Sequence, residues 1–351
     1  MMRPYVQFQM TSIIVRLRRA LGYVCAALLL SGCSDLPASL KSLNDYQQRV
    51  TNTLDQPAVS FTVPNYPRLP ASRDLQVEVP RVSISLLDAW RIESCPAAQL
   101  IAERNSALGK LSQGVTRYYG DLLLVDAGRE CVATLRAEDP NLAERLAAAL
   151  QQKAATLEAA RQQAIASDDA LRHALRMGAN GLLEADDAVF AEQLAALEQV
   201  VYALEQSQPQ SDAARVEAAL QTIHQSDYLP SLWRTLQEQS AYLAQLATIT
   251  DNLAERAGCD APSRPQRAEI LHTVFLKFFI GEVQPQLAAV TAQGQRAAVV
   301  LQRLQALTSQ PLLQDYLAQL QGSVAQLRVA TKTHVQPWQN FFTACEFTPG
   351  G

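Results

Sequence analysis

The densest group of side chains that could do chemistry consists of five polar residues in "LIAERNSALGK", residues 100–110. They are Glu103, Arg104, Asn105, Ser106 and Lys110. Asn and Ser are unfavourable inside helices because their side chains compete for backbone hydrogen bonds, so they indicate a cap, a buried network or a ligand. The group is therefore either a structural network beside a helix that stops at Gly109, or a site in which Arg104, Asn105 and Lys110 hold an anionic or polar ligand.

No catalytic or metal-binding motif accompanies this group in the sequence. The four histidines are far apart and none belongs to a His-Glu-x-x-His pair; they are His173, His224, His272 and His334. The sequence contains no Gly-x-Ser-x-Gly turn, no phosphate-binding glycine loop and no dinucleotide fingerprint. We therefore expect a protein that is not an enzyme and that uses neither a metal nor a cofactor.

Cys33 is the residue with the clearest predicted chemistry. Arginines 16, 18 and 19 precede an apolar run at residues 21–30, which is about half the roughly 20 residues that a membrane-spanning helix needs. The run ends in "LSGC", residues 30–33, which resembles the lipobox of bacterial lipoproteins. There the thiol is diacylated, the chain is cut before the cysteine and the new amino group is acylated. The alternative is an ordinary signal peptide that happens to contain Cys33.

The lipobox interpretation predicts a compartment. Residues 1–32 would be removed as a signal peptide, and a palmitate-bearing anchor on Cys33 would hold the chain on a membrane. By resemblance to the common sorting rule, Ser34 after the cysteine favours the inner leaflet of the outer membrane. Asp35, one position later, counts against this assignment. We expect a periplasmic protein anchored to the outer membrane by lipid.

The charge of the remaining chain argues against nucleic acid and anionic lipid surfaces as partners. Residues 33–351 carry 26 Lys and Arg against 34 Asp and Glu, with no basic run and few aromatic side chains. About 319 residues can bury one sizeable core or two packed halves.

Four further cysteines predict two disulfides in an exported protein. They are Cys95, Cys131, Cys259 and Cys345. Three pairings are possible, and we expect the sequential one because each bond then encloses a set of helices. A metal site is disfavoured because no two of these cysteines lie close together in the sequence.

The sequence pattern of the segments that must position these residues predicts an all-α protein. Residues 33–56 contain the lipidated end and a first helix with apolar side chains at spacings of three and four. Residues 57–82 hold five prolines, which exclude a helix and favour an extended strap. The strap is ordered if its few large apolar side chains are buried, and a flexible linker if they are not.

Residues 83–351 predict a long-helix bundle. Asp139 and Pro140 mark a helix start, and a leucine stripe continues from there to about residue 167. Leu108 and Leu111 are expected on a core face. Helix breaks are expected at residues 176–181, 206–212, 257–265 and 308–311. The aromatic-rich residues 272–287 are expected in the core, with a partner-binding groove as the alternative.

These segments together resemble the bacterial lipoproteins called the domain of unknown function 3080 family. The resemblance rests on the lipobox at Cys33, "LNDYQQRV" at 43–50, "LIAERNSALGK" with Cys95 and Cys131, and "FLKFFIGEVQPQL" at 275–287. It would cover essentially the whole chain after Cys33, and it implies no activity, cofactor or partner. The predicted lipid anchor, the long helices and the absence of catalytic motifs instead favour a non-enzymatic scaffold or modulator of another envelope component, most simply an envelope protein. The alternative is a ligand-binding lipoprotein with a polar site at residues 104–110.

Overall fold

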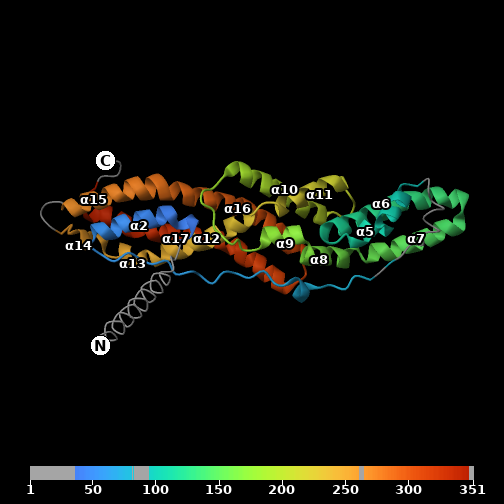
Figure 1. Ribbon diagram of the computed structural model, residues 1–351, viewed down its shortest axis with the longest axis horizontal. Helices are drawn as coiled ribbons and strands as arrows, with labels where there is room; N and C mark the ends of the chain where they lie inside the picture. The colour runs from blue at the N-terminus through green and yellow to red at the C-terminus, as the bar shows by residue number, and fades with distance from the viewer. Residues whose placement is uncertain (1–35, 81, 83–94, 261–264, 348–351) are drawn as a thin grey trace, which may run out of the picture. The chain divides into compact units, whose positions relative to one another are not determined.

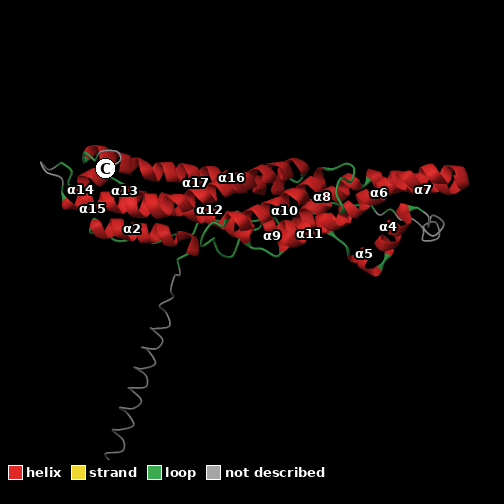
Figure 2. Cartoon of the chain, turned by 90° about the horizontal axis from the view of Figure 1, so that it is seen from above, coloured by secondary structure: helices red, strands yellow, loops and turns green. Residues whose placement is uncertain are grey.

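The computed structural model describes residues 36–80, 82, 95–260 and 265–347. The chain divides into two compact units, residues 1–36 and 37–351, and nearly all described residues belong to the second. Every regular element among the described residues is a helix, as Figure 2 shows, so the all-α prediction is confirmed. The predicted signal peptide and Cys33 lie outside the described residues.

Helices α4 to α9 follow the strap, and α10 to α17 follow them (Figure 1). The first part of the unit contains η1 (Ala38–Leu40), α2 (Lys41–Thr53), η2 (Ser72–Leu75), α4 (Pro96–Asn105), α5 (Ala107–Leu111), α6 (Gly114–Glu138), α7 (Pro140–Ala155), α8 (Leu157–Ser167) and α9 (Asp169–Leu175). The second part contains α10 (Asp187–Glu205), α11 (Ala213–His224), α12 (Tyr228–Gln245), α13 (Ala247–Thr250), α14 (Leu253–Ala257), α15 (Gln266–Val274), the π-helix η3 (Phe275–Val283), α16 (Gln284–Leu307) and α17 (Pro311–Ala344).

Helices α6 and α7 form an antiparallel pair because the chain reverses at Asp139. The Asp139 carboxylate accepts a hydrogen bond from the Leu142 N–H at 3.0 Å, and Pro140 occupies the first helical position, as predicted. The two helices approach closely where Gly128 meets Leu150, since a Cβ at Gly128 would lie 2.6 Å from the leucine side chain. Helix α4 joins this pair through Ala97 and Ile101, which pack in its core.

The long helices α12, α16 and α17 pack against one another, η3 packs against α16, and α2 packs against η3. Their core contains an aromatic cluster in which Trp338 stacks on Phe275 and Tyr46 contacts Phe279. Phe275, Phe279 and Val283 are buried, as expected for a core segment, whereas Leu276 and Ile280 are 41% and 39% exposed, so only one face of the aromatic-rich segment is core. Its π-helical winding was not predicted.

The proline-rich strap is held by side chains from α2, α8, α9 and α12, as the ordered-strap interpretation predicts. Three glutamine amides bond to its backbone: Gln47 at Val59, Gln245 at Thr62 and Gln163 at Val77. Midway along the strap, the Tyr66 hydroxyl donates to the buried Glu238 carboxylate at 3.0 Å. The structure adds one short 3-10 helix, η2, to this segment.

The two disulfides join Cys95 to Cys131 and Cys259 to Cys345, with Cα separations of 5.7 and 5.1 Å. The sequential pairing is therefore confirmed. The first bond attaches the start of α4 to α6, and the second attaches the segment after α14 to the end of α17.

Two expectations near residue 109 are wrong. Helix α4 ends at Asn105 rather than at Gly109, which lies inside α5. Gly109 allows α5 to fold back on α4, since a Cβ there would lie 2.0 Å from the Glu103 carbonyl oxygen. This turn places Leu108 and Leu111 on the surface and not on a core face: they are 81% and 72% exposed.

The four predicted breaks fall at or next to helix ends. The structure adds others, among them a break at Thr156, which divides the predicted helix of residues 140–167 into α7 and α8. None of the described helices combines the length and the apolar character that crossing a membrane requires.

Candidate functional site

A cavity of about 710 Å³ lies where the end of the strap passes helices α4, α6 and α8. Four cationic side chains and one carboxylate line it: Arg104, Lys110, Arg117, Lys153 and Asp121. The remaining lining residues are apolar or uncharged: Val77, Val79, Pro80, Val82, Ile101, Asn105, Gln113, Gly114, Tyr118, Leu124, Ala160, Gln163, Ala164 and Ser167.

Helix α4 brings Arg104 to the cavity. Pro96 opens this helix, and the disulfide from Cys95 attaches its first turn to α6. Arg104, at the other end, points its Nε to Asp121 Oδ1 at 3.1 Å and donates from Nη1 to the Gly109 carbonyl oxygen at 3.1 Å. The guanidinium is thus fixed between α6 and α5.

Asp121 is the centre of a group of three charges, in which Asp121 and Lys153 are buried and the Arg104 side chain is 23% exposed. Its second oxygen, Oδ2, accepts a hydrogen bond from Lys153 Nζ of α7 at 2.5 Å. Asp121 is 1% exposed and Lys153 is 8% exposed. One carboxylate therefore faces two cations, and the group Arg104–Asp121–Lys153 carries one net positive charge in the wall of the cavity.

Two more cations extend the positive wall. Lys110 of α5 and Arg117 of α6 line the same cavity, and the Lys110 side chain forms no ion pair or hydrogen bond with any described residue. Among the described lining residues, Arg104, Lys110 and Lys153 outnumber the one carboxylate, Asp121, although the chain as a whole is acidic.

The start of α6 is held in place by Asp168. Its Oδ2 accepts from the Val115 N–H at 2.8 Å, and its Oδ1 caps α9 through the Leu171 N–H at 2.9 Å. Burial raises the pKa of the Asp168 carboxyl against the opposing effect of these backbone donors. Gly114 takes a positive φ of 61° beside this carboxylate, where a Cβ would lie 2.2 Å from Oδ2.

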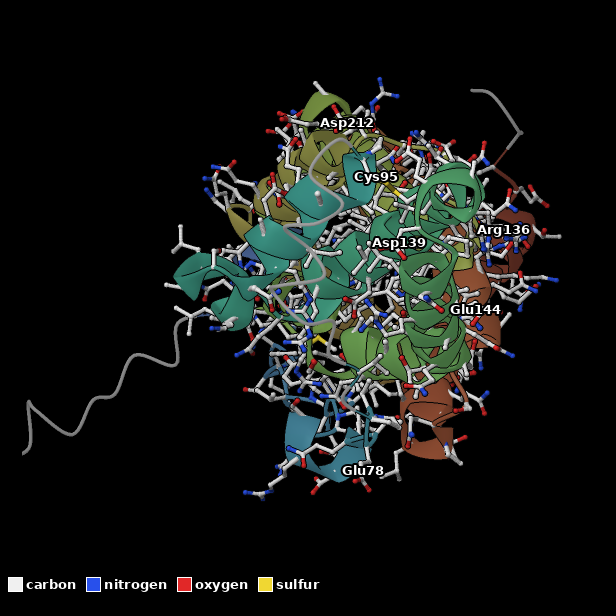
Figure 3. All side chains as sticks on the ribbon, turned by 90° about the vertical axis from the view of Figure 1, so that its right-hand side faces the viewer. Glu78, Cys95, Arg136, Asp139, Glu144 and Asp212 are labelled. Atoms are coloured by element: carbon white, nitrogen blue, oxygen red, sulfur yellow. A yellow bond between two sulfur atoms is a disulfide. The ribbon has the colours of Figure 1, made fainter. Side chains whose placement is uncertain are left out.

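The strap forms the opposite wall. Its extended backbone alternates, so Val77 and Val79 line the cavity while Glu78 between them is exposed. Figure 3 shows Glu78 at the outer edge of the strap. The Gln163 amide oxygen accepts from the Val77 N–H at 2.8 Å and holds this wall against α8.

The structure brings together three of the five predicted site residues. Arg104, Asn105 and Lys110 line the cavity. Glu103 instead accepts from Gln99 on the exposed side of α4 at 2.8 Å, and the Ser106 hydroxyl caps α5 by accepting from the Gly109 N–H at 3.0 Å. Arg104, Asn105 and Lys110 therefore belong to the candidate site. Glu103 and Ser106 lie in the turn beside it.

Sequence reasoning missed Asp121, Arg117 and Lys153. A signal for two of them was present, because Lys153 continues the buried stripe of Leu146 and Leu150, and Asp121 adjoins the buried Leu122. A charged residue on a buried helix face requires a partner, and two such residues on neighbouring helices predict each other.

The histidines do not gather into a site. His173 and His224 face each other with ring centroids 5.4 Å apart, whereas His272 packs on Phe342 and His334 on Tyr46. Within the described ranges, no cluster of three or more His, Cys, Asp or Glu residues is arranged to hold a metal ion.

A second groove of about 860 Å³ lies between α12–α13 and α17. Small and apolar side chains line most of it, and Asp251 is its one carboxylate. It lacks the converging charges of the first cavity, which is therefore the stronger candidate for a functional site.

Comparison with known proteins gives one match. The model of a family described as "Protein of unknown function (DUF3080)" matches residues 43–349, which include the whole cavity. Comparisons with curated proteins and with solved structures give no match. The description of the family names no activity. Because the match spans far more than half of the sequence, the chain belongs to the DUF3080 family of proteins of unknown function.

Proposed function

We propose that this protein is a non-enzymatic binding protein of the bacterial cell envelope that takes an anionic ligand into the cavity beside Arg104. The observation that carries the proposal is the group of Arg104, Asp121 and Lys153, in which two cations share one buried carboxylate and the charges do not balance. A positive charge shielded from water is costly unless an anion compensates it. Lys110 lines the same cavity and adds a further positive charge.

The arrangement suits binding rather than catalysis. Arginine and lysine donors are fixed by hydrogen bonds to α5 and α6, and the two oxygens of the lining carboxylate Asp121 are both bonded to cations, so this carboxylate is poorly placed to act as a general base or nucleophile. We prefer a ligand-binding role to the scaffold expected from the sequence, because the cavity gathers the most distinctive polar residues of the chain.

Location in the envelope is part of the proposal. The lipobox-like "LSGC" supports a signal peptide ending at residue 32 and a lipid anchor on Cys33, facing the periplasm from the outer membrane. Labelled palmitate should enter the wild-type protein and not the Cys33→Ser variant. Equal labelling of both would contradict the anchor.

A matched pair of dyes tests the anion site. Anilinonaphthalene sulfonate is an anion, and phenylnaphthylamine carries similar rings without the charge. We expect Lys110→Ala to weaken binding of the sulfonate and to leave binding of the neutral dye unchanged. Lys332→Ala is the control, because Lys332 is also exposed but lies on α17 away from the cavity. The proposal is wrong if the two lysine variants bind the sulfonate equally well.

A further inference from the structure

The composition of the cavity walls narrows the class of anion. We infer that the ligand is an acidic amphiphile: a molecule with a phosphate or carboxylate head and an aliphatic chain. This inference rests on the proposed anion site and adds the chain to it.

The cavity separates charge from aliphatic surface. The cations come from α4, α5, α6 and α7, whereas the strap contributes Val77 and Val79, and Ile101 and Leu124 add apolar surface between the helices. A small hydrophilic anion would use only the cationic wall and leave the valines against water. An amphiphile uses both walls, because its chain removes the valines from water while its head contacts the cations.

Among the described lining residues, no carboxylate is free to repel an acidic head. Asp121 is the one Asp or Glu in this set, and both its oxygens already accept hydrogen bonds from cations. Glu78 lies between the two valines in sequence, but the alternation of the extended strap directs it to solvent. The strap therefore presents only its apolar side chains to the cavity at these three positions.

The size of the cavity also favours a ligand with a chain. A volume of about 710 Å³ falls in the range of pockets that enclose organic ligands of roughly 300–1,000 Å³. A phosphate ion alone would fill a small part of this space.

Three probes separate the head from the chain. Dodecyl phosphate carries both, ethyl phosphate carries the head with almost no chain, and dodecylphosphocholine carries the same chain under a head with no net charge. Each is titrated calorimetrically into the full chain with both disulfides intact, below the concentration at which micelles form. We expect dodecyl phosphate to bind at least about tenfold more tightly than either of the others.

Two variants assign the two parts of the ligand to the two walls. Lys110→Ala should weaken dodecyl phosphate binding, whereas Lys332→Ala should not. Val79→Asn should weaken binding of dodecyl phosphate about fivefold or more and leave the weak binding of ethyl phosphate unchanged. Val79 is only partly buried in the strap, so this substitution leaves the helical core intact.

Each contrary result has its own meaning. If ethyl phosphate binds as tightly as dodecyl phosphate, the chain is not recognised and the inference fails while the anion site stands. If dodecylphosphocholine binds as tightly, the charge is not recognised and the anion site fails as well. Absence of binding by dodecyl phosphate overturns the inference directly.

Discussion

At Asp121, one carboxylate holds two cations from different helices, and the three side chains cannot be exchanged independently. Asp121→Asn removes the only negative charge and leaves Arg104 and Lys153 facing each other in a buried site. We expect this substitution to lower the free energy of unfolding by about 3–5 kcal/mol.

Lys153→Met should lower the free energy of unfolding by no more than about half as much as Asp121→Asn does, because the remaining pair of Arg104 and Asp121 is balanced in charge. Urea denaturation of the ligand-free variants measures both values. Equal losses would show that the imbalance of charge has no energetic consequence, which would weaken the case for an anion in the cavity.

His334 provides a second prediction at the scale of a residue. It is buried against the Phe279 ring, with Nε2 3.0 Å from the Tyr46 hydroxyl, and burial lowers its pKa from 6.5 to about 4. Between these pH values the unfolded chain binds more protons at this residue than the folded one. Its contribution to stability is therefore fully present above pH 6.5 and is lost as the pH falls to about 4.

Protonation of His334 in the unfolded chain should lower the free energy of unfolding by about 3 kcal/mol. Denaturation of the wild-type protein and of His334→Phe at pH 7 and pH 4.5 measures the contribution of His334, because the other titrating groups are common to both proteins. The variant should lose less stability on acidification than the wild type does. Parallel losses would show that His334 is not held neutral by burial.

Among the elements, the strap depends on glutamine side chains rather than on a ladder of backbone hydrogen bonds. Gln163 holds Val77, and Arg172 Nη2 donates to the Pro70 carbonyl oxygen at 2.7 Å. Gln163→Ala should free the end of the strap that forms the wall of the cavity. Loss of one hydrogen bond worth about 1 kcal/mol should raise the rate of tryptic cleavage after the exposed Arg73 about fivefold.

Gln162 is the matched control for this prediction. It is the adjacent residue in α8, but its amide bonds to the Leu307 carbonyl oxygen and the Ser309 N–H, far from the strap in sequence. Gln162→Ala should leave cleavage after Arg73 close to the wild-type rate. If both glutamine variants accelerate cleavage alike, the strap is not held locally by Gln163.

The same elements show what the sequence can and cannot predict. Apolar spacing, the Asp139 cap and the prolines of the strap are local signals, and the structure confirms the helices and the strap that they predict. The return of α5 onto α4 depends on the close approach that Gly109 permits, which spacing does not reveal. The pairing of Asp121 with Lys153 depends on how α6 packs on α7 across 32 residues, so the sequence indicated part of the site but not its central charge group.

For the molecule as a whole, the two disulfides should have separable effects. Cys95–Cys131 encloses a separation of 36 residues and fixes the start of the helix that carries Arg104, whereas Cys259–Cys345 encloses 86 residues and links the ends of α14 and α17. Figure 2 shows α4 and α14 toward opposite ends of this unit. In the chain-entropy model each bond contributes roughly 4 kcal/mol, so removing either one should lower global stability by a similar amount.

The affinity for dodecyl phosphate should nevertheless fall when only one of the two disulfides, Cys95–Cys131, is removed. Replacing Cys95 and Cys131 by serine should release α4, speed amide exchange in residues 96–105 and weaken dodecyl phosphate binding about tenfold or more, because Arg104 loses its fixed position. Replacing Cys259 and Cys345 should lower the unfolding temperature while leaving the affinity for this probe unchanged. Hydrogen exchange and calorimetry on the two double variants decide the point. A loss of affinity shared equally by both would mean that binding follows global stability and not the placement of α4.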